Sequence, residues 1–272
     1  MASRKEQKEQ ARAARLQQEQ EHAAKTARTR RFAIFGGVIA IAVIVIVVAI
    51  AISSGGSSNN SSVNKAQAKA TYATVNSLIG GIPQTGTVLG QPKAKVTMTY
   101  YGDLECPICR DFTLDYFPQF VQDQVRTGKV KVDYRSFCTA SCNNTTVSDP
   151  QAVFNTQQVA AYAAGKQNLF WYYTELFYHE QGTEDTPYVT SSYLEGLAKQ
   201  IPQLNLKTWQ TDRTDPELAD QVSSDLSEAS KLGLQGTPTL IMSGPKGSET
   251  VTGPDGDIPT YSDLAAAVQT VS

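Results

Sequence analysis

Four cysteines, arranged as two close pairs, are the residues of this sequence best suited to chemistry. Cys106 and Cys109 form a Cys-Pro-Ile-Cys motif, and Cys138 and Cys142 are separated by three residues. Thiolates act as nucleophiles, as metal ligands and as partners in disulfide exchange. The spacing of the first pair lets both sulfurs meet in one disulfide, which makes it a candidate redox centre. A structural disulfide and half of a zinc site are the alternatives.

The Cys-Pro-Ile-Cys motif lies between a predicted strand and a predicted helix. Residues 94–101 alternate in polarity, which is typical of a strand. Pro107 favours the first position of a helix that begins after Cys106. The free N–H groups and the dipole at this helix end stabilise an anion, so we predict a lowered pKa for the Cys106 thiol. Cys109 lies one turn further, where we expect it to be more buried and to resolve a mixed disulfide.

The remainder of residues 66–272 predicts an α/β domain with a helical middle. A second strand at 129–137 follows the motif helix, which Pro118 is expected to kink, and this strand–helix–strand unit implies parallel pairing. The late hairpin and the other helices are predicted at 239–242 and 249–252, and at 65–78, 151–164, 169–178, 191–201, 217–232 and 260–271. Thr260 and Asp263 form a capping pattern at the start of the last helix.

Two motifs together resemble the active site of the DsbA-like thiol–disulfide oxidoreductases of the thioredoxin superfamily. The first is Tyr-Tyr-Gly-Asp-Leu-Glu-Cys-Pro-Ile-Cys, which ends at Cys109, and the second is Gly-Thr-Pro-Thr at 236–239. The resemblance covers about residues 88–270. It implies a thioredoxin-like fold with a helical insertion at about 148–232, because the two motifs are much further apart than in plain thioredoxins.

The resemblance also implies roles for the residues around the cysteines. Pro238 is expected to be a cis-proline, and Thr237 to offer backbone groups to a substrate peptide. Pro107 and Ile108 complete the implied active-site loop. Strongly oxidising members carry His where this chain has Ile108, so we expect a less depressed pKa for the Cys106 thiol and a less oxidising potential.

Two acidic residues precede the motif and bear on the same thiolate. Asp103 and Glu105 would oppose the negative charge on Cys106 if they were close to it. We expect both carboxylates to be partly solvated and screened.

The second cysteine pair calls for a separate interpretation. We predict that Cys138 and Cys142 form a short-loop structural disulfide at the exit of the second strand. The alternatives are a second redox pair that relays electrons from the first, and a copper site completed by a distant His179. A structural Cys138–Cys142 disulfide requires no metal and no cofactor. In that case we expect His179 to lie on a helix surface. The aromatic residues around 170–178 are expected to be helical core.

The N-terminal part of the chain predicts a membrane anchor. Residues 32–52 contain no charge and are long enough to span a bilayer, whereas a cleaved signal peptide would have a shorter apolar run. The polar arm at 1–31 carries 9 Lys/Arg against 4 Asp/Glu, and Arg28, Arg30 and Arg31 directly precede the apolar segment, which predicts that the arm lies in the cytoplasm. A flexible linker is expected at 53–65. The residues after the arm carry 15 basic against 22 acidic side chains, which argues against a nucleic-acid partner.

These features predict a single-pass thiol–disulfide oxidoreductase of the cell membrane whose domain at 66–272 lies outside the cytoplasm. The resemblance implies cysteine-containing secreted or envelope proteins as substrates. It also implies reoxidation by a quinone-linked membrane partner of the DsbB or vitamin-K-epoxide-reductase type. A reductase or isomerase with the same fold, and a binding module with purely structural disulfides, are the alternative functions.

Overall fold

The computed structural model describes residues 59–253, 256 and 258–272. The predicted arm at 1–31, the predicted membrane span at 32–52 and the start of the predicted linker lie outside the described residues. Within the described part, no helix combines the length and the apolar character needed to cross a membrane. Residues 66–272 form one compact unit.

The first described helix is longer than the sequence pattern indicates. Helix α2 covers Asn59–Ile79, whereas the prediction was a helix at 65–78 preceded by a linker at 53–65. The end of the predicted linker is therefore helical. The Ser and Asn residues of this stretch are weak helix formers, but they do not prevent a helix that continues into a favourable sequence.

A six-stranded sheet holds the described part of the fold together, in the order β1-β2-β4-β3-β5-β6. Its strands are β1 (Gln84–Thr85), β2 (Val88–Leu89), β3 (Val96–Gly102), β4 (Val130–Ser136), β5 (Thr239–Gly244) and β6 (Gly247–Val251). The central strands β3 and β4 pair in parallel, as predicted. Strand β5 pairs antiparallel with both β3 and β6, which confirms the late hairpin. The two-residue strands β1 and β2 were not predicted.

The motif helix runs on from Pro107 to Val125 but changes its hydrogen-bond pattern twice. It consists of α3 (Pro107–Asp111), η1 (Phe112–Tyr116), α4 (Phe117–Phe120) and η2 (Val121–Val125). The segments η1 and η2 are π-helical, and the N–H of Phe117 donates to the carbonyl of Phe112. Because Pro118 cannot donate and its ring crowds the preceding turn, a widened turn before it is a natural accommodation. The predicted disturbance at Pro118 takes this form.

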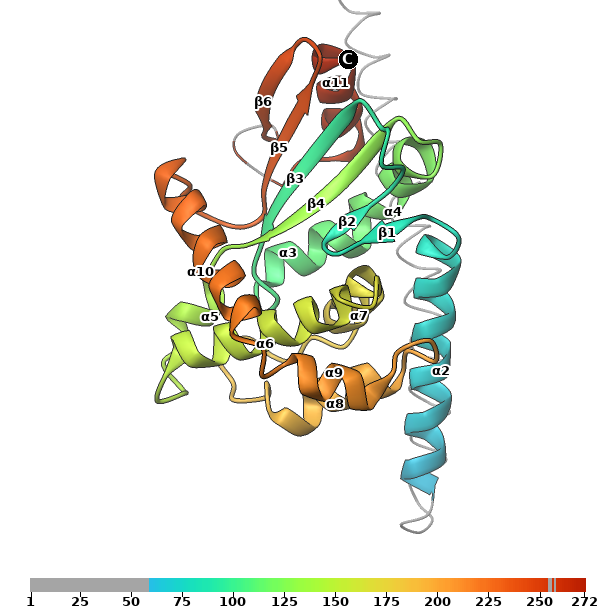
Figure 1. Ribbon diagram of the computed structural model, residues 1–272, viewed down its shortest axis with the longest axis vertical. Coiled ribbons are helices and arrows are strands. Elements are labelled where there is room, and N and C mark those ends of the chain that lie inside the picture. Colours follow the sequence, from blue (N-terminus) through green and yellow to red (C-terminus); the bar gives the residue numbers. More distant parts are fainter. Residues whose placement is uncertain (1–58, 254–255, 257) are drawn as a thin grey trace, which may run out of the picture. The chain divides into compact units, whose positions relative to one another are not determined.

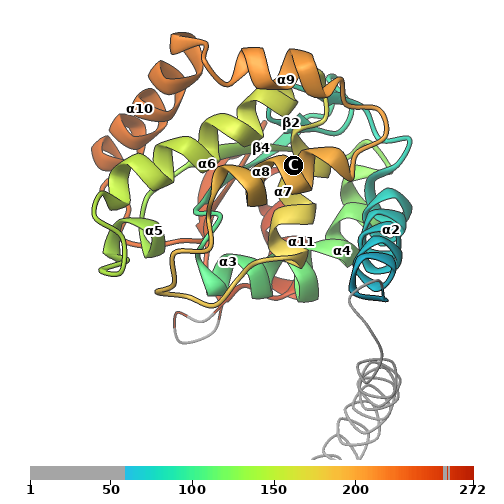
Figure 2. The ribbon, with the colours of Figure 1, turned by 90° about the horizontal axis from the view of Figure 1, so that it is seen from below.

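The remaining helices form the insertion and the C-terminal end. They are α5 (Ala140–Asn143), α6 (Pro150–Gly165), α7 (Phe170–His179), α8 (Ser191–Lys199), α9 (Leu206–Asp212), α10 (Pro216–Lys231) and α11 (Tyr261–Val271). Helices α6 to α10 lie between β4 and β5 in sequence and gather at one end of the sheet (Figure 1, and from below in Figure 2). The capping box of Thr260 and Asp263 at α11 is confirmed. Helices α5 and α9 were not predicted.

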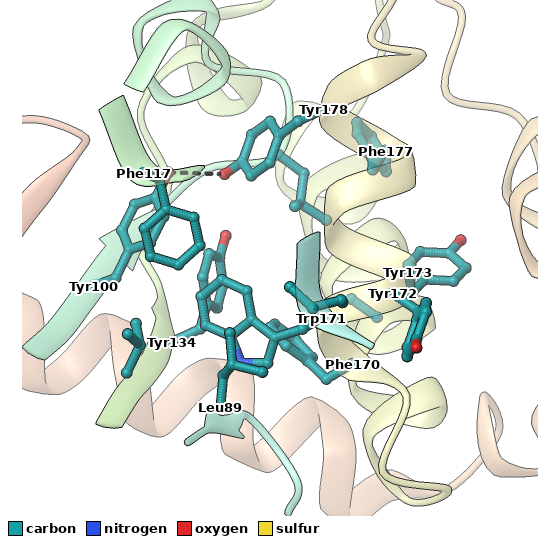
Figure 3. Packing of buried hydrophobic residues seen from close by; sticks show 14 of the residues in the cluster. Leu89, Tyr100, Phe117, Tyr134, Phe170, Trp171, Tyr172, Tyr173, Phe177 and Tyr178 are labelled. Carbon is teal, nitrogen blue, oxygen red and sulfur yellow. Dashed lines mark hydrogen bonds between the residues drawn. The ribbon is translucent and has the colours of Figure 1, made fainter. Parts of the chain in front are cut away.

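An aromatic cluster joins the insertion to the sheet. Figure 3 shows Trp171 and Phe170 of α7 turned toward Tyr134 of β4. The ring centroids of Phe170 and Tyr134 are 5.1 Å apart, and the rings of Trp171 and Phe117 stack at 5.4 Å. The indole N–H of Trp171 also donates to the carbonyl of Thr87 at 2.8 Å. The predicted role of the aromatic run as helical core is therefore confirmed.

Candidate active site

Cys106 lies after the end of β3 and directly before the motif helix. It is the N-cap of α3, with Pro107 in the first turn, as the sequence predicted. The N–H of Cys109 donates to the Cys106 sulfur at 3.4 Å. Hydrogen bonding with the Cys109 thiol, opposed by burial and helped by hydrogen bonding with Thr237, lowers the pKa of Cys106 to about 7. The Cys106 thiol is therefore predisposed to ionise near neutral pH.

Cys109 occupies the opposite kind of environment. Its side chain is completely buried, whereas Cys106 keeps 5% of its surface exposed, and both are free cysteines. Burial, reinforced by hydrogen bonding with Cys106 and by the charge of that thiolate, raises the pKa of Cys109 well above its ordinary value. The two thiols therefore differ both in accessibility and in the pH at which they ionise.

The loop before β5 brings a second segment to Cys106. The Thr237–Pro238 peptide bond is cis, which is the expected isomer. The Cys106 thiol donates to the carbonyl oxygen of Thr237 at 3.4 Å, across 131 positions of sequence. The two motifs that carry the resemblance therefore meet in space.

Asp103 is fully buried, which corrects the expectation that it would be partly solvated. Its carboxylate accepts hydrogen bonds from the backbone N–H groups of Thr139 and Ser141 at 2.8 and 2.9 Å. It also accepts from the N–H of Glu105 at 3.0 Å and from the Ser141 hydroxyl at 2.5 Å. Burial raises the pKa of Asp103, while these hydrogen bonds lower it. Asp103 thus fastens the loop that contains the second cysteine pair.

Glu105 is also buried, so the same expectation is wrong for it. Its carboxylate accepts a hydrogen bond from the side-chain amide of Gln157 at 3.2 Å. Burial raises the pKa of Glu105, and the nearby charge of Asp103 acts in the same direction. Both corrections have one cause: residues from α5 and α6, far along the chain, cover these carboxylates.

The second cysteine pair forms the predicted disulfide between Cys138 and Cys142. The bond borders a groove of about 540 Å³ that also contains the Cys106 side chain, and Pro107, Ile108 and Thr237 contribute to the same wall. The disulfide is therefore a neighbour of the Cys-Pro-Ile-Cys motif rather than a remote staple.

Two further residues named by the sequence are Ile108 and His179. Ile108 is 49% exposed and offers an apolar side chain beside Cys106. His179 ends α7 half-buried, which differs from the expected surface position. Burial lowers its pKa, and the positive charge of Arg110 acts in the same direction. Among the residues described, no group of three or more His, Cys, Asp or Glu is arranged to hold a metal ion.

Sequence reasoning missed Thr139 and Gln181. The hydroxyl oxygens of Thr139 and Thr237 are 2.5 Å apart, so Thr139 connects the disulfide loop to the proline loop. The Gln181 side-chain amide donates to the carbonyls of Leu104 and Cys106 at 2.7 and 3.1 Å and so fixes the turn before α3. Polar residues on distant loops carry no local pattern that would identify them.

The thioredoxin family model matches residues 83–255. Disulfide bond formation protein D of Bacillus subtilis (strain 168) is 26% identical over 162 residues, which cover 57% of this chain and 66% of that protein.

Solved structures show the same fold. The crystal structure of oxidised BdbD from Bacillus subtilis matches with a TM-score of 0.56 at 23% identity, covering 71% of this chain and 96% of the other. Alpha-DsbA1 of Wolbachia pipientis matches with a TM-score of 0.53 at 18% identity, covering 68% of this chain and 89% of the other.

Proposed function

The chain belongs to the thioredoxin family and is a DsbA-like thiol–disulfide oxidoreductase, and from this premise we propose that Cys106 and Cys109 are its redox pair. The observation that carries the proposal is the contrast between the two thiols. Cys106 opens onto the groove with a pKa of about 7, and Cys109 is buried behind it with a raised pKa. A substrate can therefore reach one sulfur of the pair and not the other.

The reaction we propose oxidises a pair of substrate thiols. A substrate thiolate attacks the Cys106 sulfur of the oxidised pair, which forms a mixed disulfide and releases Cys109. A second substrate thiolate then attacks the substrate sulfur and releases Cys106. The low pKa of Cys106 favours this second step, because a thiol of lower pKa is the better leaving group. Two electrons pass from substrate to enzyme, and the substrate gains a disulfide.

The residues around the sulfurs have positioning roles in this proposal. Thr237 holds Cys106 through its carbonyl, and the backbone beside Pro238 is available to pair with an extended substrate. Pro107 and the exposed apolar side chain of Ile108 border the groove where the substrate would lie. The substrates are cysteine-containing secreted or envelope proteins, and a quinone-linked membrane oxidase of the DsbB or vitamin-K-epoxide-reductase type reoxidises the pair. These partners follow from the family resemblance.

We propose further that residues 32–52 anchor the protein and that its folded domain lies outside the cytoplasm. The support is the uncharged length of this segment and the three arginines Arg28, Arg30 and Arg31 just before it. Protease added to intact cells from which the wall has been removed should digest the domain and spare the arm. Recovery of the full chain in the soluble fraction would contradict the anchor.

The equilibrium reduction potential tests the direction of electron flow. The full chain in detergent, with Cys138 and Cys142 replaced by Ser, reports the first pair alone. A value near about −120 mV supports disulfide formation, and a value near about −270 mV identifies a reductase. The same measurement on the chain with Cys106 and Cys109 replaced gives the matched value for the second pair. If Cys106 and Cys109 do not equilibrate with a glutathione buffer, the domain is a binding module whose disulfides are purely structural.

A further inference from the structure

The proposed reaction leaves the second cysteine pair unused, although it lies in the same groove. Cys106, Cys138 and Cys142 all contribute to the wall of this one groove of about 540 Å³. Cys138 and Cys142 are half-buried, so both keep some exposed surface beside the space that a substrate thiol would enter. A structural staple has no need to lie there.

Two sets of contacts hold this pair against the redox motif. The Thr139 hydroxyl, next to Cys138, lies 2.5 Å from the hydroxyl of Thr237, whose carbonyl accepts a hydrogen bond from Cys106. On the other side, the buried carboxylate of Asp103 accepts from the N–H groups of Thr139 and Ser141, which lie between the two cysteines. The loop is thus fixed to both segments that contact Cys106. Because the loop pair and Cys106 belong to one chain and line one groove, the loop thiols have a higher effective concentration at Cys106 than thiols of a separate molecule.

We propose that the Cys138–Cys142 disulfide is made in cis by the Cys106–Cys109 disulfide of the same chain, across this groove. The inference rests on the proposed function, because it treats the loop pair as the first dithiol that the redox pair oxidises. It assigns a substrate that is part of the enzyme itself.

The exchange balances without an added oxidant. One loop thiolate attacks the Cys106 sulfur, which forms an intrachain mixed disulfide and releases Cys109 as a thiolate. Cys109 takes up the proton that the loop thiol gave to water. The second loop thiolate attacks the first loop sulfur, closes the Cys138–Cys142 bond and releases Cys106 as a thiolate. Two electrons move from the loop pair to the motif pair.

The experiment follows the two bonds in time in the full chain in detergent. All four cysteines are first reduced, and one equivalent of oxidised glutathione is then added. Samples are quenched with acid, alkylated and mapped by peptide mass spectrometry. We expect the Cys106–Cys109 bond to appear first and to be replaced by the Cys138–Cys142 bond. The rate constant of this replacement should not change when the protein is diluted tenfold, because the step is intramolecular.

Two variants make the test specific. In the variant Cys109→Ser, Cys142→Ser, glutathione oxidises Cys106 and both thiols that could resolve the intrachain link are missing, so Cys106 should be found linked to Cys138 within a monomer. In the double variant Cys106→Ser, Cys109→Ser, the loop bond should form at least about tenfold more slowly than in the wild type. Circular dichroism of each reduced variant shows that it is folded.

The outcomes separate this inference from the proposed function. Equal rates of loop-bond formation in the wild type and in Cys106→Ser, Cys109→Ser would overturn the inference. A rate that falls with dilution, or the lack of an intrachain link in Cys109→Ser, Cys142→Ser, would also overturn it. Oxidation of a separate dithiol peptide by the wild type is measured in parallel. If that peptide is oxidised while the loop bond forms independently of Cys106, only the inference fails. If the peptide is not oxidised, the proposed function itself fails.

Discussion

At the scale of single residues, the ionisation of Cys106 links the redox state to stability. The folded protein lowers the pKa of this thiol from the ordinary value of 9.0 to about 7. A lowered pKa contributes stability that is fully present above the unfolded value and is lost as the pH falls through the folded value. In the reduced chain, Cys106 should therefore contribute on the order of 2 kcal/mol more at high pH than below pH 7.

Chemical unfolding of the reduced protein and of reduced Cys106→Ser measures this contribution. The difference between their free energies of unfolding should grow between about pH 6 and about pH 9. The serine variant cancels the contributions of the titrating groups that do not interact with Cys106. A difference that is constant over this range would show that Cys106 has an ordinary pKa in the folded state.

The buried carboxylate of Asp103 should oppose the same thiolate. Its negative charge raises the pKa of Cys106, although less than the hydrogen bonds lower it. Asp103→Asn removes the charge and keeps one oxygen that accepts hydrogen bonds, so the pKa of Cys106 should fall below about 7. The ultraviolet absorbance of the thiolate during a pH titration measures this change. As a comparison, Asp111→Asn changes an exposed carboxylate on α3 and should leave the titration nearly unchanged. If the pKa of Cys106 rises in Asp103→Asn, the substitution has detached the loop at 138–142 from Asp103.

At the scale of elements, α7 carries a carboxyl group in an apolar setting. Glu175 is completely buried, and neither of its oxygens has a hydrogen-bond partner among the described residues. Burial raises the pKa of Glu175 to about 8. A raised acid pKa means that stability is complete below the unfolded value of 4.5 and is lost as the pH rises through the folded value.

Glu175→Gln should remove this loss because the glutamine stays neutral. We expect the variant to be more stable than the wild type at pH 8 by on the order of 3 kcal/mol, and about equal to it near pH 4. Urea unfolding at both pH values measures the two differences. If Glu175→Gln is equally less stable than the wild type at both pH values, the Glu175 carboxylate makes a stabilising interaction that the glutamine cannot replace.

Local patterns predicted most elements, and their failures have physical causes. The helix start at Pro107 and the capping box of Thr260 and Asp263 were predictable because their signals lie within a few residues. Strands β1 and β2 have two residues each, too few to show a period. Helix α9 buries only Trp209, but its N-cap Asn205 was a usable signal. The burial of Asp103 depends on partners 36 and 38 positions away, which no local pattern contains.

At the scale of the whole molecule, Asp225 joins the end of the insertion to the sheet. Its side chain, on α10, is 1% exposed and accepts from the N–H of Ser136 at 3.0 Å and from the Arg135 guanidinium at 3.2 Å. The hydroxyl of Tyr162 on α6 donates to the same carboxylate. The Asp225 carboxylate therefore connects α10 to both α6 and β4 by hydrogen bonds.

Asp225→Ala should cost about 3 kcal/mol, because it leaves the buried N–H of Ser136 without its acceptor, removes one partner of the buried Tyr162 hydroxyl and breaks one of the two ion pairs of Arg135. As the matched control, Glu195→Ala breaks a surface ion pair with Lys199 and should cost less than about 0.5 kcal/mol. Denaturant unfolding compares the two. Equal losses would mean that the aromatic cluster alone holds the insertion in place.

The distance between Cys106 and Thr237 along the chain has a consequence for biosynthesis. A ribosome adds roughly 5–20 residues per second, so the 131 positions that separate them take on the order of ten seconds. Once Cys142 has been added, all four cysteines have been made. The Thr237 carbonyl that accepts from the Cys106 thiol, and strand β5 that pairs with β3, are added only later. The reactive thiols therefore exist before their groove does. A nascent chain that stalls within the insertion carries thiols that any passing oxidant can join in the wrong order.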